Sequence, residues 1–239
     1  MMTRGGSFPT THWSLLMKLG EPQTRETALR EICQRYWRPL YSYCRCRGLG
    51  VEDAEDATQG FFEQLLRLEV FERMGTGGQG RMRSFLLTGM QNWLAKQHRH
   101  RTALKRGGAV LDLPLDFAGA EAAVALQVED GKTPEVLYER RWAETLLLEA
   151  RRQLKADYET AGKAEILRVL SPHLAGDEAA ASMAEIGAEL GVTEGHARVL
   201  LHRLRKHYRA ALREEIARTV ETEDEVEEEM RHLRRVLLG

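Results

Sequence analysis

Residues 181–212 read ASMAEIGAELGVTEGHARVLLHRLRKHYRAAL, and the spacing of apolar residues in this stretch predicts two helices joined by a sharp turn. Gly191 is expected to supply the left-handed residue of that turn, because glycine has no Cβ to clash in this conformation. Val192 should fill the angle between the helices. Thr193 is expected to cap the second, longer helix through its hydroxyl.

The longer helix is amphipathic and basic. It is expected to bury Ala197, Leu200, Leu201 and Leu204 and to expose Arg198, His202, Arg203, Arg205 and Lys206. A short helix, a glycine turn and a basic second helix are typical of a helix-turn-helix, whose second helix enters the DNA major groove. Its chemistry suits DNA, because guanidinium groups match guanine edges and a capped helix N-terminus, here at Thr193, can hold a phosphate.

Two kinds of contact are expected from this helix. Arg198 and Arg203 are placed to read bases, whereas Arg205, Lys206 and Arg209 are expected to contact phosphates. An amphipathic pair of helices with a solvated basic face is the alternative interpretation of the same pattern.

Charge is segregated along the chain, although the formal net charge is only −1. Residues 81–106 carry seven basic residues and no acid, and residues 194–213 carry six basic residues and one acid. Residues 214–230 reverse the sign, with nine acids and one arginine. Two basic segments far apart in the sequence indicate two contacts with one polyanion.

Helical periodicity extends over most of the remaining chain, and strand signals are nearly absent. Pro39 is expected to kink or end the first helix. Between Gly107 and Pro134 the periodicity fails among glycines, prolines and short apolar groups. We therefore predict an all-α protein with two small helical domains joined by a flexible linker, the C-terminal one a helix-turn-helix. The expected ranges are 8–106 for the first domain, 107–134 for the linker, 135–215 for the second domain and 216–239 for an acidic C-terminal extension.

The first basic segment contains residues suited to an unpaired strand. Trp93 lies among Asn92, Lys96, His98 and Arg99. An aromatic ring interleaved with amide and positive groups can receive the unstacked bases of a single strand. The helical spacing of Trp93 favours the alternative, a ring buried in the core with the polar residues around it facing solvent.

Several classes of protein are disfavoured. No apolar run approaches the roughly 18 residues of a membrane span, and the first residues lack the apolar core of a secretion signal, so we expect a cytoplasmic protein. Cys33, Cys44 and Cys46 fit reduced thiols. A metal site at Cys44 and Cys46 is disfavoured, because residues two apart on a helix point in different directions.

An enzyme is a further alternative, for instance a nuclease or a metal-dependent hydrolase. It would use the histidines His98, His100, His196 and His202. No cluster of carboxylates accompanies them in their basic segments, so we expect no catalytic residue, no metal and no cofactor.

Three segments, in this order, resemble conserved regions of the sigma-70 family of RNA polymerase sigma factors, especially its extracytoplasmic function group. Residues 53–66, DAEDATQGFFEQLL, are similar to the region that binds the polymerase clamp. Residues 81–101, RMRSFLLTGMQNWLAKQHRHR, resemble the region that melts and reads the −10 element. Residues 181–212 resemble the region that reads the −35 element. The resemblance spans nearly all of the first 215 residues.

The resemblance implies a promoter-specificity subunit, with core RNA polymerase, promoter DNA and an anti-sigma factor as partners. The linker would run through the polymerase toward its RNA exit path. A stand-alone helix-turn-helix regulator that binds duplex DNA as a dimer is the alternative. The implied contacts are Asp53, Asp56, Gln59 and Glu63 for the clamp, Arg83, Asn92, Lys96 and Arg99 for the −10 strand, and Arg198, Val199, His202 and Arg203 for the −35 groove.

The chain also departs from the family pattern. Phe85 stands where many relatives have Trp, and Gly89 lies inside a helix, where glycine costs about 1 kcal/mol relative to Ala. The acidic segment Thr219–Met230 goes beyond the minimal two-domain pattern. A solvated helix is the favoured interpretation of this segment, because charge runs are usually solvated. In the alternative, the segment folds back on a basic DNA-binding face as a mimic of phosphate.

Overall fold

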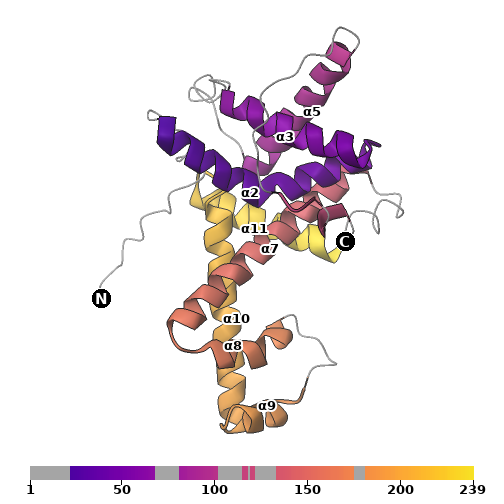
Figure 1. The fold of residues 1–239 in the computed structure, drawn as a ribbon. Coiled ribbons are helices and arrows are strands. Elements are labelled where there is room, and N and C mark those ends of the chain that lie inside the picture. The colour runs from indigo at the N-terminus through magenta and orange to yellow at the C-terminus, as the bar shows by residue number, and fades with distance from the viewer. Residues whose placement is uncertain (1–21, 68–80, 102–114, 118, 122–132, 175–180) are drawn as a thin grey trace. The chain divides into compact units, whose positions relative to one another are not determined.

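The computed structural model describes residues 22–67, 81–101, 115–117, 119–121, 133–174 and 181–239, with side chains described from residue 30 onward and excluding 66–67 and 98–101. All regular elements in these ranges are helices, which confirms the predicted all-α class (Figure 1). The helices are α2 (Pro22–Cys46), α3 (Val51–Arg67), α5 (Met82–Arg101), α7 (Pro134–Thr160), α8 (Ala164–Leu170), the 3-10 helix η1 (Ser171–Leu174), α9 (Met183–Glu189), α10 (Glu194–Ala217) and α11 (Glu223–Leu238).

The chain divides into two compact units. Unit 1 comprises residues 1–145 and 216–239, and unit 2 comprises residues 146–215. This division differs from the expected ranges, because the first half of α7 and the whole C-terminal extension belong to unit 1. The extension contributes to that unit the buried side chains Ile216, Val220, Val226 and Leu233.

In unit 1, α2 packs against α3 and α5. Pro39 lies inside α2, which continues to Cys46, so this helix does not end at the proline. Gly48, with φ +89°, follows the helix end in the left-handed conformation. The first half of α7 joins this core through Trp142, whose ring stacks on Tyr36 at a centroid distance of 4.6 Å.

Two glycines let α3 and α5 approach closely. A Cβ at Gly89 of α5 would lie 3.0 Å from two ring atoms of the buried Phe61 on α3. A Cβ at Gly60 of α3 would lie 3.0 Å from the indole ring of Trp93 on α5. The helix propensity lost at Gly89 is therefore exchanged for tight packing between the two helices.

Part of the predicted linker is ordered against α2. The ring centroid of Phe117 lies 4.8 Å from that of Trp37 and 5.2 Å from that of Tyr41. Glu121 accepts bonds from Arg45 at 2.7 and 2.9 Å, and one from the Tyr41 hydroxyl at 2.6 Å. Residues 115–117 and 119–121, which were expected to belong to a flexible linker, are therefore held against α2. The linker residues 107–114, 118 and 122–132 lie outside the described residues.

Unit 2 has its own apolar core. The second half of α7 contributes Leu154 and Tyr158, α8 contributes Val169 and Leu170, and α9 and α10 close the cluster. Arg168 of α8 bonds both Glu165 on its own helix and Glu189 on α9. No helix in the described part of the chain is long and apolar enough to cross a membrane.

Candidate nucleic-acid interface

The connection between α9 and α10 is fixed by local chemistry. Ser182 and Glu185 form a capping box at the start of α9, each side chain satisfying a backbone N–H of the other residue. Gly191 has φ +66°, which confirms the left-handed residue expected in the turn. The Thr193 hydroxyl accepts a bond from the His196 N–H at 3.3 Å, which confirms the expected cap of α10.

Gly187 holds α9 against this turn. A Cβ at Gly187 would lie 2.9 Å from the carbonyl oxygen of Val192, a distance that real Cβ atoms essentially never show. The Val192 N–H donates to the Gly187 carbonyl at 2.8 Å, and Val192 itself packs against the core of unit 2. These contacts hold the turn between the two helices, and Thr193, Glu194 and Gly195 at the start of α10 are exposed.

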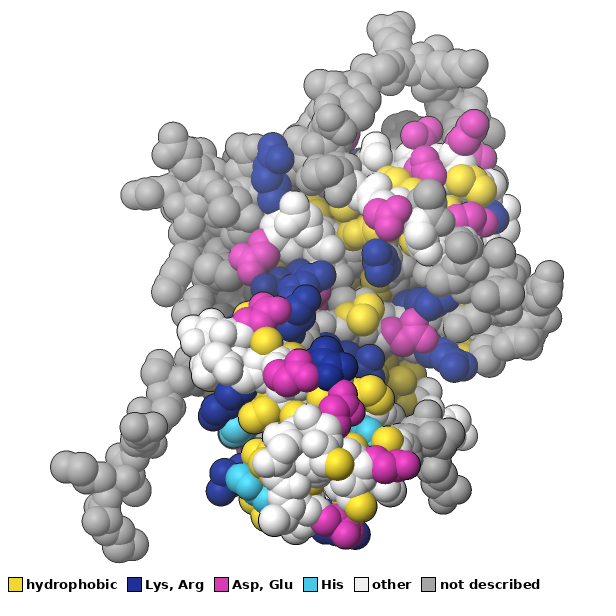
Figure 2. Space-filling view, turned by 60° about the horizontal axis from the view of Figure 1, so that its bottom comes forward, with side chains coloured by type: hydrophobic (Ala, Val, Ile, Leu, Met, Phe, Trp, Pro, Cys, Tyr) yellow, Lys and Arg dark blue, Asp and Glu magenta, His cyan; other side chains and the backbone are white. Residues whose placement is uncertain are grey.

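The outward side of α10 carries a cluster of positively charged residues. Val199, His202 and Lys206 follow one another at spacings of three and four, so they form a central stripe, with Arg198 and Arg203 on its two flanks. In Figure 2, basic and histidine side chains lie next to one another on this unit. Val199 is 44% exposed, so this stripe offers an apolar contact among the basic side chains. The basic face of α10, as we define it, comprises the exposed residues His196, Arg198, Val199, His202, Arg203, Lys206 and Arg209.

Two arginines of α10 already have partners within unit 2. Arg205 was expected to contact phosphate, but its guanidinium donates to the carbonyl of the buried His173 at 2.8 Å and so ties η1 to α10. We therefore leave Arg205 out of the basic face. Arg198 pairs with Glu194 one turn earlier. Both of these side chains are exposed, so their pair is weak and does not prevent Arg198 from binding another group.

The outward side of α5 carries a polar stripe. Asn92 and Lys96, both expected to handle the −10 strand, are exposed and share this side at a spacing of four. Ser84 and Thr88 extend the same stripe toward the start of the helix and are also exposed. These two hydroxyls were not among the predicted site residues, although their spacings of four and eight residues from Asn92 place them on the same side of a helix. Arg99 lies in α5, but its side chain is outside the described residues.

Arg83 was also expected to handle the −10 strand, but its side chain does not lie in this stripe. Its side chain is only 9% exposed and forms a bidentate pair with Glu229 at 3.0 and 3.1 Å, and it also bonds Glu139. Burial works to lower the pKa of Arg83, but the bonds to Glu229 and Glu139 outweigh it and raise the pKa. Arg83 is thus a charged group held inside unit 1, because carboxylates of two other helices reach it.

The acidic side of α3 is accessible. Asp53, Asp56, Gln59 and Glu63, the four residues expected to contact the polymerase clamp, are exposed or half-exposed. They lie away from the buried Ala54, Phe61, Phe62 and Leu65 of the same helix. The structure therefore brings these four side chains together on one surface of unit 1.

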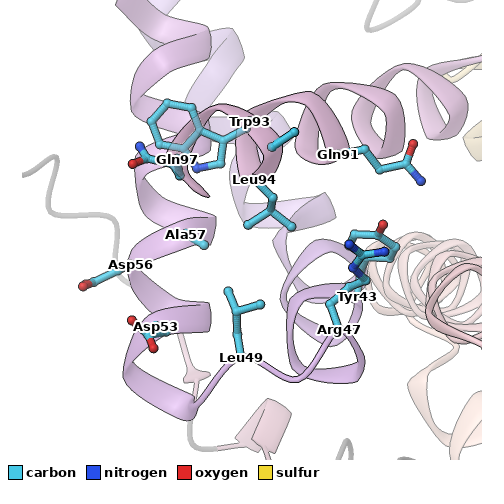
Figure 3. A pocket seen from close by; sticks show the side chains of 11 residues that line it. Tyr43, Arg47, Leu49, Asp53, Asp56, Ala57, Gln91, Trp93, Leu94 and Gln97 are labelled. Carbon is cyan, nitrogen blue, oxygen red and sulfur yellow. The ribbon is translucent and has the colours of Figure 1, made fainter. Parts of the chain in front are cut away.

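A hollow of about 890 Å³ opens between the end of α2, the start of α3 and the middle of α5. Figure 3 shows Leu49 and Leu94 at its centre, with Asp53 on the α3 side and Arg47 on the α2 side. Trp93 lines the hollow but packs on Gly60, and its indole N–H is buried with no acceptor among the described residues. The packing of Trp93 supports the core interpretation of this ring.

Two of the three thiols, Cys33 and Cys44, are buried in α2. Burial raises the pKa of Cys44 to about 12 and also raises the pKa of Cys33, so neither thiol is readily ionised. Within the ranges that the structure describes, no three His, Cys, Asp or Glu side chains are grouped closely enough to hold a metal ion.

Comparison of the chain with protein-family models, with curated proteins and with solved structures finds no match. The case for a function therefore depends on the surfaces described above.

Proposed function

We propose that this chain is a promoter-specificity subunit of RNA polymerase, a sigma factor of the extracytoplasmic function type. The observation that carries the proposal is the basic face of α10, which follows a capped N-terminus and a left-handed glycine turn. A helix of this kind, presented outward by a shorter helix, fits the geometry in which a recognition helix enters the major groove. The resemblance of residues 53–66 and 81–101 to sigma-70 regions adds the polymerase to the proposal.

In the proposed complex, unit 2 reads duplex DNA at the −35 element. Arg198 and Arg203, on the two flanks of the central stripe, reach base edges, and the methyl groups of Val199 contact a thymine methyl. Lys206 and Arg209, farther along α10, contact phosphates. The N–H groups at the Thr193 end of α10 suit a phosphate, because they form the positive end of the helix dipole.

Unit 1 acts on the −10 element in this proposal. The polar stripe of α5 offers hydroxyls, an amide and the Lys96 ammonium to a displaced strand. The apolar floor of the neighbouring hollow, formed by Leu49 and Leu94, gives an unstacked base a place to lie. Flipping out a base costs a few kcal/mol, which these contacts must offset. Catalysis remains with the polymerase.

The acidic side of α3 is the proposed contact with the polymerase clamp. Asp53 and Asp56 would pair with basic groups there, and Gln59 and Glu63 continue the same surface along the helix. Opposite charge on the two partners favours rapid and selective association.

The decisive experiment is reconstitution of the purified chain with core RNA polymerase. We expect specific transcripts from a subset of promoter fragments, and weak binding of the chain to the same fragments without polymerase. Specific start sites can be mapped by sequencing the 5′ ends of the transcripts. Asp53→Lys combined with Asp56→Lys should abolish co-purification with the core, while Asp157→Lys, at an exposed residue of α7 in unit 2, serves as a single-substitution control outside the acidic side of α3.

Two outcomes would overturn the proposal. Failure of the chain to bind core polymerase would remove the sigma-factor role. Tight binding of the chain alone to palindromic duplex sites, with no transcript in the reconstituted system, would favour the dimeric regulator instead.

A further inference from the structure

The C-terminal helix α11 brings carboxylates to the start of α5. Arg81, the residue before α5, bonds Glu228 and also lies with its Nε 2.9 Å from Glu229. Arg83 holds the same Glu229 through two nitrogens, at 3.0 and 3.1 Å. One carboxylate is therefore shared by two guanidinium groups of the first basic segment.

A second acid completes the network around Arg83. Glu139 of α7 accepts from the Nη1 of Arg83 and lies 2.7 Å from the ring nitrogen of His232 on α11. The Nε, Nη1 and Nη2 atoms of Arg83 all donate to carboxylates of its own chain. Because these donors are already bonded, Arg83 cannot donate a pair of N–H groups to a nucleic-acid phosphate at the same time.

The backbone adds another attachment. The N–H of Met82, at the start of α5, donates to the carbonyl of Thr219 at 3.0 Å. This N–H is one of the groups that a helix start leaves unpaired and that could otherwise bind a phosphate. The connection between α10 and α11 thus accepts a backbone hydrogen bond from the start of α5. Glu228 and Glu229 of α11 pair with the neighbouring arginines Arg81 and Arg83.

We propose that α11 is a displaceable autoinhibitory strap, which withholds Arg81 and Arg83 from a DNA strand by holding them with carboxylates. This inference rests on the proposed function, in which α5 receives the displaced strand. Carboxylate and phosphate bind guanidinium in the same bidentate way, so the two cannot occupy one arginine together. Binding of a strand would require release of Glu228 and Glu229.

The packing of α11 is compatible with such release. Val226 and Leu233 are its buried apolar side chains, whereas Leu237 and Leu238 at its end are exposed. Glu228 is about half-exposed, so water and salt reach its pair with Arg81. Glu229 is 4% exposed and pairs with both Arg81 and Arg83.

The test compares full-length variants for binding of a fluorescein-labelled single-stranded oligonucleotide over a series of KCl concentrations. The variant E228Q/E229Q removes both carboxylates that hold Arg81. The matched control E221Q/D224N removes two exposed acids from the same segment, neither of which contacts Arg81 or Arg83 in the network described above. Helical circular dichroism verifies that each variant is folded.

We expect E228Q/E229Q to bind the oligonucleotide more tightly than the unchanged chain, while E221Q/D224N does not. The plot of log Kobs against log salt should become steeper by about 1.4, because each additional phosphate contact on a single strand contributes about 0.7. In an R81Q background the same glutamate changes should steepen the plot by only about half as much, since one arginine remains to be released.

A second measurement uses the unchanged chain, so that the proposal can still be tested if E228Q/E229Q does not fold. Saturating oligonucleotide should accelerate amide hydrogen exchange in α11, because the bound strand displaces the helix. Exchange that is unchanged or slower would overturn the strap.

Failure of the strap can be told apart from failure of the proposed function. Equal salt slopes for E228Q/E229Q and the unchanged chain, with polymerase-dependent transcripts still present, would overturn the strap alone. Absence of oligonucleotide binding by every variant at the lowest salt would overturn the strap together with strand capture by α5.

Discussion

Gly187 and Gly191 set the approach of α9 to the start of α10, each for a different steric reason. Gly187 has no room for a Cβ, because the Val192 carbonyl oxygen would lie 2.9 Å away. Gly191 has open space around it but a φ of +66°, which disfavours any residue with a Cβ. Gly195, in the first turn of α10, has neither constraint and nothing within 4 Å of its added Cβ.

These three glycines give a stability prediction with an internal control. Gly191→Ala should lower the free energy of unfolding by about 1–2 kcal/mol through the left-handed backbone. Gly187→Ala should lower it by about 1–3 kcal/mol through overpacking. Gly195→Ala should instead raise it, by up to about 1 kcal/mol, because alanine favours the helix. Urea denaturation followed by circular dichroism measures all three. Equal effects at the three positions would contradict the turn geometry.

Arginines on the two flanks of α10 provide a test of base reading. Arg198→Ala or Arg203→Ala should cost about 1–3 kcal/mol in binding of the reconstituted polymerase to its promoter and relax preference at one base pair. Lys206→Ala should weaken binding to all sequences alike. Competition between promoter fragments with single base changes distinguishes these outcomes. If Arg198→Ala and Arg203→Ala each weaken binding to all promoter fragments equally, both arginines contact phosphates and not bases.

At the scale of elements, the short segment around Phe117 and Glu121 is fastened to α2 by an aromatic contact and an ion pair. The bond from Arg45 holds the pKa of Glu121 below its ordinary value of 4.5. Partial burial acts to raise this pKa, and the bond from Tyr41 acts to lower it. Burial first, and then the bond to Glu121, raises the pKa of Tyr41. The attachment is thus made with an ionised Glu121.

The attachment should depend on pH in the acid range. Because the pKa of Glu121 is lower in the folded chain than in the unfolded chain, its stabilisation is present above the unfolded value and is lost as pH falls through the folded value. Glu121→Gln should therefore reduce the free energy of unfolding at pH 7 and have progressively less effect below about pH 4. Denaturation at several pH values measures this, with the exposed Asp116→Asn as a control that changes little. An effect of Glu121→Gln that is constant with pH would contradict the ion pair.

At the scale of the whole molecule, the two units present separate surfaces, which the proposed function assigns to one promoter DNA. Unit 2 presents the basic face of α10, and unit 1 presents the polar stripe of α5 with the acidic side of α3. If the two units have the proposed roles, duplex binding and strand opening should respond to different substitutions.

Lys206→Ala and Lys96→Ala should therefore impair different steps in the reconstituted system. Lys206→Ala should weaken the initial complex and reduce the salt slope of duplex binding by about 0.9, the contribution of one phosphate. Lys96→Ala should leave that complex intact but slow opening, measured by permanganate reactivity of unpaired thymines. Lys155→Ala, at an exposed residue of α7, should change neither step. Loss of both steps in both variants would show that the division of roles is wrong.

Local sequence determined the elements that depend on near neighbours. The helices around Gly191, the cap by Thr193 and the exposed side of α10 follow from spacing, because the interacting groups lie within a few residues of each other. The all-α class was predictable for the same reason. The acidic extension also carried a local signal, since Val226, Met230 and Leu233 have the spacing of a buried helix side within a run of acids.

Tertiary structure alone decided what happens to Arg83, Arg205 and the extension. The partners of Arg83 are Glu139 and Glu229, which are 56 and 146 residues away in the chain, and the partner of Arg205 is the carbonyl of His173, 32 residues away. Sequence spacing shows which side of its helix an arginine occupies, but the burial of that side depends on which distant helix packs there. A charge that looks free in the sequence is therefore held by carboxylates or carbonyls that only the folded chain brings within bonding distance.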